Sequence, residues 1–252
     1  MELRSLKVAF HHPSGLTEGS ADYRSLQITT VTTGHYSHYR FREKVTGFAD
    51  AEVNAKRGVY GNALQAASYE GNELIVKLLL DNGAEVNVEG GELGTALQAA
   101  SFIGNEAVIK LLLDNGAEVN AEVGELGSAL QAASFIGNKA VVKLLLENGA
   151  EVNAKGGELG RALQAASYSG NEAIVKLLLE NGSEVNAEGG KYGNSLQAAS
   201  YKGNEGIVKL LLENGADVNA EGGQYGNALR AASYEGNELI VKLLLENGAE
   251  VM

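Results

Sequence analysis

The sequence predicts an all-α solenoid built from stacked pairs of short helices. Three observations support this fold class. First, the chain repeats itself with a period of 33 residues, so that six similar units occupy residues 60–251. Second, leucine recurs at one position of every unit and glycine at another. Third, each unit holds two short apolar segments that end at glycine, the pattern of a helix, a turn and a second helix.

Within a unit, capping residues mark both helices. In the second unit Thr95 is placed to cap a helix over "ALQAASFI", and Gly104 ends that helix. Asn105 is placed to cap a helix over "EAVIKLLLDN", which Gly116 ends with a left-handed turn. The first helix has small residues, so neighbouring units can approach closely, whereas large aliphatic residues cover much of the second. The glycine-rich segment that follows, "AEVNAEVGELG", predicts an extended β-hairpin finger.

The chain divides into an N-terminal extension or cap, residues 1–49, and a repeat domain, residues 50–252. In the extension, "SLQITTVTTGHYSHYRFREKV" is rich in β-branched and aromatic residues around a Thr33-Gly34 turn, which predicts a β-hairpin. Residues 49–58 match the tail of a unit before the first one. Three roles stay open for the extension: a cover for the first unit, a severed piece of a longer protein, or a partly disordered segment.

Composition narrows the function classes. The chain has no cysteine and no tryptophan, which removes disulfides, cysteine metal sites and thiol catalysis. The net charge is −12; residues 1–49 carry six basic and four acidic residues, and the rest carries 14 and 28. An acidic repeat domain repels phosphate backbones, so we expect no nucleic-acid partner. No stretch reaches the roughly 18 apolar residues of a membrane span, so we expect no membrane partner and a cytoplasmic or nuclear location.

Motifs of metal and carboxylate chemistry are incomplete. All four histidines lie in residues 1–49, and no further ligand completes a metal set with His35 and His38. Glu92, Glu125 and Glu158 recur on neighbouring fingers, which should stand on the order of 10 Å apart. That spacing is wide for two carboxylates that share a proton. We therefore predict no metal, no cofactor and no catalytic residue.

The unit "GTALQAASFIGNEAVIKLLLDNGAEVNA" resembles the ankyrin repeat, and the similarity covers about four-fifths of the chain. Where that family usually has Thr-Pro-Leu-His, this chain has Thr95-Ala96-Leu97-Gln98, and Gly104-Asn105 replaces Gly-His. Glutamine and asparagine can still donate and accept hydrogen bonds, so we expect the network between units to survive. The "GGELG" and "GGQYG" turns replace an aspartate-bearing turn, and this variant is similar to repeats of fungal signalling and self-recognition proteins.

The resemblance implies binding through the finger tips and the concave side of the first helices, where one column of this chain is aromatic in every unit. Two interpretations stay open: a row of the core between units, or an exposed stripe along the groove. In units two and three isoleucine follows the aromatic residue, which would give an apolar patch rimmed by glutamates. Arg161 and Lys191 break the pattern of their columns, either to tune specificity or by neutral drift. The predicted partner-binding residues are Tyr69, Glu92, Leu93, Phe102, Ile103, Glu125, Leu126, Phe135, Ile136, Glu158, Leu159, Arg161, Tyr168, Lys191 and Tyr201.

The function predicted from these features is a non-catalytic binding scaffold for a protein or peptide. An acid-rimmed aromatic groove favours a partner with basic and apolar side chains. The alternative is a small-molecule enzyme of the cyclase or isomerase type that uses the same groove to fold an apolar substrate.

The last unit lacks the polar exchanges of a terminal repeat. It keeps the internal apolar pattern at Leu239, Ile240, Val241 and Leu243–Leu245. Apolar surface left in water costs about 25 cal/mol per Å². We therefore expect this end to fray or to be covered by another chain, for example through self-association.

Overall fold

The computed structural model describes residues 7–8, 28–29, 53–54, 60–124 and 127–251. The chain forms two compact units, Met1–Ala49 and Asp50–Met252. In the first unit, strands β1 (Lys7–Val8) and β2 (Ile28–Thr29) pair in antiparallel register. The turn of the β-hairpin predicted at Thr33-Gly34 lies outside the described residues.

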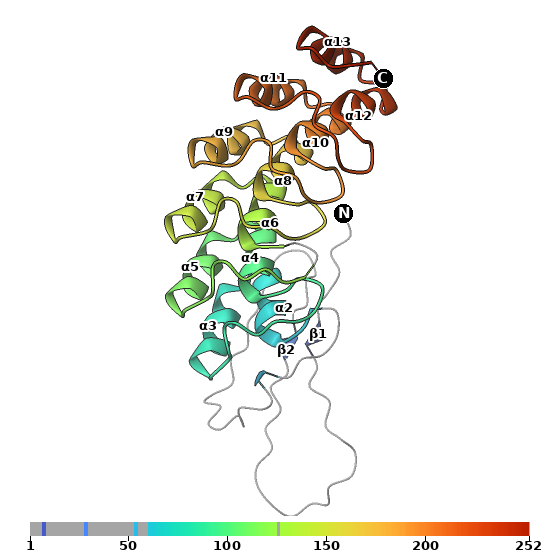
Figure 1. Ribbon diagram of the computed structural model, residues 1–252. Coiled ribbons are helices and arrows are strands. Elements are labelled where there is room, and N and C mark those ends of the chain that lie inside the picture. Colours follow the sequence, from blue (N-terminus) through green and yellow to red (C-terminus); the bar gives the residue numbers. More distant parts are fainter. Residues whose placement is uncertain (1–6, 9–27, 30–52, 55–59, 125–126, 252) are drawn as a thin grey trace, which may run out of the picture. The chain divides into compact units, whose positions relative to one another are not determined.

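The described part of the second unit holds six helix pairs in tandem. Figure 1 shows the first helices of the pairs stacked in one row and the second helices stacked in a neighbouring row. This arrangement confirms the predicted all-α solenoid. The pairs are α2 (Ala63–Tyr69) with α3 (Glu73–Asp81), α4 (Ala96–Ile103) with α5 (Glu106–Asp114), α6 (Ala129–Ile136) with α7 (Lys139–Glu147), α8 (Ala162–Ser169) with α9 (Glu172–Glu180), α10 (Ser195–Lys202) with α11 (Glu205–Glu213), and α12 (Ala228–Tyr234) with α13 (Glu238–Glu246).

The helices of the second pair begin and end at the predicted capping residues. Before α4, Thr95 Oγ1 accepts a hydrogen bond from Gln98 N at 3.2 Å, and Gln98 Oε1 accepts from Thr95 N at 2.5 Å, which completes a capping box. Asn105 Oδ1 accepts from Val108 N at 3.0 Å and caps α5. Gly104 follows α4 with a φ of 81°. A Cβ at Gly104 would stand 2.6 Å from a side-chain nitrogen of the next pair, so both conformation and space favour glycine there.

The core lies between successive pairs and combines small residues with branched ones. Ala99 and Ala100 of α4 are fully buried, and their small side chains let the first helices pack closely. Ile109 and Leu112 of α5 are also fully buried and fill the space between the two rows of helices. Equivalent positions are buried in the other internal pairs, so each pair completes the core of its neighbours.

A buried glutamine in the first helix of each of the first five pairs joins that pair to the next. Gln98 Nε2 donates to Ala121 O at 3.1 Å and to Val123 O at 2.9 Å, in the segment that leads to the following pair, and it also donates to Gly127 O. Because an amide both donates and accepts, one side chain caps its own helix and holds the next pair. Equivalent bonds come from Gln65, Gln131, Gln164 and Gln197.

Two columns of asparagine add further bonds between pairs. Asn105, which caps α5, donates from Nδ2 to Gly71 O of the preceding pair at 3.0 Å. Asn87 clamps the turn after α5, because its Nδ2 donates to Gly116 O at 3.0 Å and its Oδ1 accepts from Glu118 N at 2.9 Å. The same clamp is made by Asn54, Asn120, Asn153, Asn186 and Asn219.

The connecting fingers are less regular than the predicted β-hairpins. The described fingers contain isolated bridges, Gly189 with Gly193 and Gly222 with Gly226, in place of longer ladders. Glycine conformation explains the difference, since Gly190 has a φ of 64°, outside the range of a β-strand. A Cβ at Gly190 would stand 2.5 Å from a backbone nitrogen of the preceding finger. The glycines therefore let neighbouring fingers stack backbone to backbone.

We predict that Gln197→Leu destabilises the end of the array, because it keeps the side-chain volume but removes the bonds to Ala220 O and Gly226 O at 2.9 and 3.1 Å. We expect the free energy of unfolding, measured in urea, to fall by about 1–3 kcal/mol, and hydrogen exchange in α12 and α13 to become faster. Arg230→Leu is the matched control, because Arg230 occupies the same column in the last pair and is exposed. Equal stability of the two variants would contradict the bridging role.

Candidate partner-binding surface

One aromatic side chain stands at or near the end of every first helix, and these rings form a ladder along the array. The aromatic ladder consists of Tyr69, Phe102, Phe135, Tyr168, Tyr201 and Tyr234. The rings of Tyr69 and Phe102 are stacked with their centroids 6.5 Å apart, and Tyr168 and Tyr201 are stacked at 6.3 Å. The ladder is half-buried except at Tyr234, which is 72% exposed. Each ring of the ladder therefore packs on at least one other aromatic ring and still presents part of its surface to the outside.

The fingers add a second row of side chains that fit between the rungs of the ladder. Tyr192 lies 4.6 Å from Tyr168 and 5.1 Å from Tyr201, measured between ring centroids. Tyr225 lies 4.8 Å from Tyr201, and Tyr60 lies 5.5 Å from Tyr69. The equivalent residues Leu93 and Leu159 are half-buried, and Leu126 lies outside the described residues. Ring contacts run without a break from Phe135 to Tyr234, and a second group joins Tyr60, Tyr69 and Phe102.

The second and third pairs give this surface its apolar half. Ile103 and Ile136 directly follow the ladder rings of Phe102 and Phe135, and each isoleucine is 43% exposed. The finger tips beside this half carry the exposed carboxylates Glu92 and Glu158, whereas Glu125 lies outside the described residues. The predicted apolar positions are thus brought together next to acidic groups.

The fourth to sixth pairs form a half rich in tyrosine hydroxyls. Tyr192 donates a hydrogen bond to the hydroxyl of Tyr168 at 3.3 Å. Burial, and then this bond, raises the pKa of Tyr192 above its ordinary value of 10.0. A hydrogen bond with Tyr225, and then burial, raises the pKa of Tyr201 in the same direction. These two phenols are therefore neutral at physiological pH and present hydrogen-bonding groups rather than charge.

Two lysines border the tyrosine half. Lys202 Nζ lies 4.7 Å from the ring centroid of Tyr168, and Lys191 Nζ lies 5.8 Å from that of Tyr192. Both distances fall within the range of a cation–π contact. Lys191 was among the predicted residues, whereas Lys202, Tyr192 and Tyr225 were not. Their positions in the same 33-residue columns as Ile103 and Leu93 were the signal that could have identified them.

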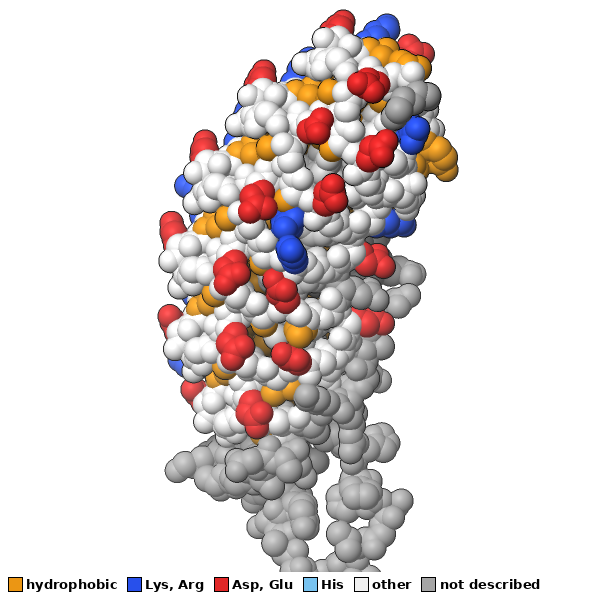
Figure 2. Space-filling view, in the orientation of Figure 1, with side chains coloured by type: hydrophobic (Ala, Val, Ile, Leu, Met, Phe, Trp, Pro, Cys, Tyr) orange, Lys and Arg blue, Asp and Glu red, His pale blue; other side chains and the backbone are white. Residues whose placement is uncertain are grey.

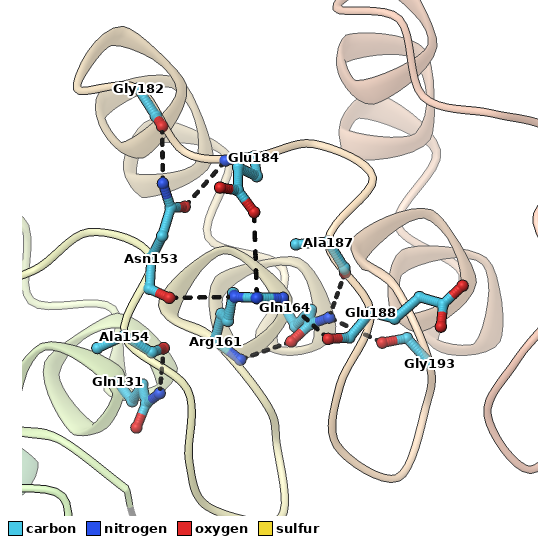
Figure 3. A network of polar contacts seen from close by, with 10 residues as sticks. All are labelled: Gln131, Asn153, Ala154, Arg161, Gln164, Gly182, Glu184, Ala187, Glu188 and Gly193. Carbon is cyan, nitrogen blue, oxygen red and sulfur yellow. Dashed lines mark hydrogen bonds and ion pairs between the residues drawn. The ribbon is translucent and has the colours of Figure 1, made fainter.

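Arg161 lies inside the array and does not contribute to this surface. The residue occupies the N-cap position of α8, and its side chain is only 11% exposed. Its Nε donates to Asn153 O at 3.1 Å and its Nη1 donates to Glu188 O at 2.8 Å, so the guanidinium joins two successive fingers (Figure 3). The carboxylate of Glu184 stands 4.0 Å from Nη2 and is mostly exposed, so solvent weakens this ion pair. Arg161 therefore bridges fingers inside the array, in contrast to the exposed binding position predicted for it.

Acidic side chains are spaced along the whole array, as Figure 2 shows for one face. Three columns are acidic in all or nearly all of the described pairs, and every member is exposed. They make the repeat domain strongly anionic. The columns are Asp81, Asp114, Glu147, Glu180, Glu213 and Glu246; Glu85, Glu118, Glu151, Glu184, Asp217 and Glu250; and Glu89, Glu122, Lys155, Glu188 and Glu221.

The described ranges hold neither a cluster of metal ligands nor a helix that could span a membrane. Among residues 7–8, 28–29, 53–54, 60–124 and 127–251, no group of three or more histidine, cysteine or carboxylate side chains could hold a metal ion. The helices described in the same ranges are all too short or too polar to cross a membrane.

Comparison with known proteins identifies the repeats. The family model described as "Ankyrin repeats (3 copies)" matches residues 39–123, 122–189 and 163–252. The chain belongs to the ankyrin-repeat family. Among solved structures, the ankyrin-repeat domain of human ASB11 is similar, with 30% sequence identity and a TM-score of 0.65 over 75% of this chain and 85% of that one. No curated protein sequence matches.

We predict that Arg161→Ala lowers the free energy of unfolding by about 1–3 kcal/mol, because two backbone carbonyls of the fingers lose a charged donor. Arg161→Ser should be less damaging, since serine can supply the side-chain cap that α8 lacks. Urea unfolding of both variants measures the effect, with Lys155→Ala as the control at an exposed basic position. An Arg161→Ala protein as stable as the Lys155→Ala protein would contradict the finger-bridging role.

Proposed function

We propose that this protein is a non-catalytic scaffold that binds a protein or peptide along the aromatic ladder. Ankyrin repeats generally mediate interactions between proteins, and the chain consists mostly of such repeats. The observation that carries the proposal is the exposure of Ile103 and Ile136 beside the half-buried rings of Phe102 and Phe135. Contiguous apolar side chains that remain exposed on a folded protein mark interaction surfaces.

The ladder is well suited to anchor a partner because its side chains are already ordered. Rings that stack on their neighbours lose little further conformational entropy when a partner covers their outer edges. The carboxylates of Glu92 and Glu158 would form a polar rim and attract basic groups of the partner at the apolar half. Nothing that the structure describes favours the alternative of a cyclase or isomerase, so it forms no part of the proposal.

We predict that the double variant Phe102→Ala and Phe135→Ala weakens partner binding by about 2–4 kcal/mol, as loss of anchor residues does. The partner is first captured from the native cell and identified by mass spectrometry. Titration calorimetry with the purified partner then compares the wild-type and variant proteins.

The matched control is the double variant Leu74→Ala and Leu239→Ala. These leucines are 65% and 64% exposed and lie in second helices, away from the ladder. The control should bind as the wild type does. If the Phe102→Ala and Phe135→Ala double variant is stably folded and binds the partner with unchanged affinity, the proposed surface is refuted.

We also propose that the end of the last pair associates with a second copy of the chain. Tyr234 and Leu245 are 72% and 42% exposed, whereas the same columns are half-buried in the fifth pair. The apolar residues that the sequence keeps at this end lie in α13, and exposed Arg230 of α12 stands where the preceding pairs have the bridging glutamine. Arg230 also borders a cavity of about 160 Å³ with Glu250 and Val251. Cationic and anionic groups on one face of the last pair could pair with their counterparts across a two-fold axis.

We predict that the apparent mass in light scattering rises with protein concentration, and that Tyr234→Ser with Leu245→Glu abolishes the rise. Leu74→Glu, which places a charge at an exposed leucine elsewhere, should leave the rise unchanged. A strict monomer at high concentration, with α13 as protected from hydrogen exchange as α11, would contradict self-association.

A further inference from the structure

The fifth helix pair places two positive charges on a surface that is elsewhere neutral or acidic. Lys191 occupies the finger-tip column, where the sequence has glutamate in the second, third and fourth units and glutamine in the sixth. Lys202 occupies the column after the ladder ring, where the other units have glutamate, isoleucine or serine. We call Lys191, Lys202 and the rings of Tyr168, Tyr192 and Tyr201 the lysine–tyrosine site.

The lysines of this site are held by aromatic rings. Lys202 Nζ lies 4.7 Å from the centroid of Tyr168 and 6.0 Å from that of Tyr201, so its amine bridges two rungs of the ladder. Lys191 Nζ lies over the ring of Tyr192. These contacts hold both ammonium groups beside the ladder.

The backbone beneath Lys191 is also fixed. Lys191 N donates to Glu158 O of the preceding finger at 2.8 Å, and Lys191 O accepts from Gln224 N of the following finger at 3.0 Å. The tip that carries this lysine is therefore bonded on both sides. A charge on such a support is preorganised to meet a partner group.

Neither ammonium group belongs to an ion pair within the described part of the chain. The ion pairs described there involve Lys110, Arg161, Lys176 and Lys209, and none includes Lys191 or Lys202. Both lysine side chains are exposed. The hydrogen bond from Tyr192 to the hydroxyl of Tyr168 leaves the Tyr168 proton for an outside acceptor. The site thus offers two exposed cations and, beside them, a hydroxyl donor on a half-buried ring.

The lysine–tyrosine site is continuous with the apolar half of the ladder. Phe135 stacks on Tyr168 at 6.3 Å between centroids, and Tyr168 stacks on Tyr201 at the same spacing. One extended or helical segment of a partner would therefore cover both the isoleucines of the second and third pairs and the lysines of the fifth.

We propose that the partner segment carries acidic side chains that bind Lys191 and Lys202, next to apolar side chains that bind Ile103 and Ile136. This inference rests on the proposed function and adds the partner's chemistry and direction. Carboxylates meet positive charge at the fifth pair and repulsion from Glu92 and Glu158 at the apolar half. A segment laid in the opposite direction would place its acidic groups against those glutamates, so only one direction along the array is favourable.

The experiment uses the full chain as bait for a displayed library of random peptides. The wild type should enrich peptides in which aspartate or glutamate lies to one fixed side of an apolar cluster. The charge-reversed variant, Lys191→Glu with Lys202→Glu, should lose this acidic preference and gain lysine or arginine at the same side. The control, Lys143→Glu with Lys155→Glu, makes the same charge change at exposed lysines outside the ladder and should select as the wild type does.

Binding of one enriched acidic peptide, synthesised with a fluorescent label, then gives the affinity. It should fall at least about tenfold in the charge-reversed variant and weaken with added salt, because exposed charges are screened over about 8–10 Å. This inference would be overturned if the enriched peptides lacked acidic residues, or if the wild type and the charge-reversed variant selected the same acidic peptides. Either result would leave the proposed scaffold function intact. If the wild type enriched no peptides beyond those that the Phe102→Ala and Phe135→Ala double variant enriches, both the proposed function and this inference would be overturned.

Discussion

The buried glutamine of each first helix sets the relation between one helix pair and the next. Its carbonyl oxygen accepts from the N-cap of its own helix, and its amide nitrogen donates to the finger that leads into the following pair, as Gln197 does to Ala220 O and Gly226 O. A side chain with only one of these capacities would leave either the helix start or the finger carbonyls without a partner inside the core. Because the bond is repeated at the same place in each internal pair, successive pairs stack in the same register.

That register is what turns single residues into surfaces. A ring at the end of one first helix meets the ring of the next pair, so Phe135, Tyr168 and Tyr201 become neighbours although 33 residues separate each from the next. The stacking constrains the size and flatness of these side chains, while the positions beside them are free to change from isoleucine to lysine. The scaffold can therefore vary the chemistry along the ladder without altering its geometry.

A residue that differs from the equivalent residues of the other units does not by itself mark a binding site. Arg161 and Lys191 both break the pattern of their columns, yet Lys191 is exposed at a finger tip and Arg161 is buried between two fingers. Arg161 lacks the side-chain oxygen with which most equivalent residues cap their helix, and its guanidinium donates to Asn153 O and Glu188 O instead. Arg230 departs from the glutamine column where the described array has no later pair to bridge. These outcomes depend on what lies opposite each side chain, which spacing in the sequence does not record.

The sequence by itself determined the period, the helix pairs, the caps at Thr95 and Asn105 and the left-handed glycine at Gly104, because these follow from contacts a few residues apart. It also grouped the aromatic residues into one column. Only the tertiary structure decided that the ladder is half-buried, that Tyr192 and Tyr225 fit between its rungs, and that Lys202 lies over Tyr168. Those relations join residues of different pairs, and they depend on the rotation and separation of neighbouring pairs, which the packing of the whole array sets.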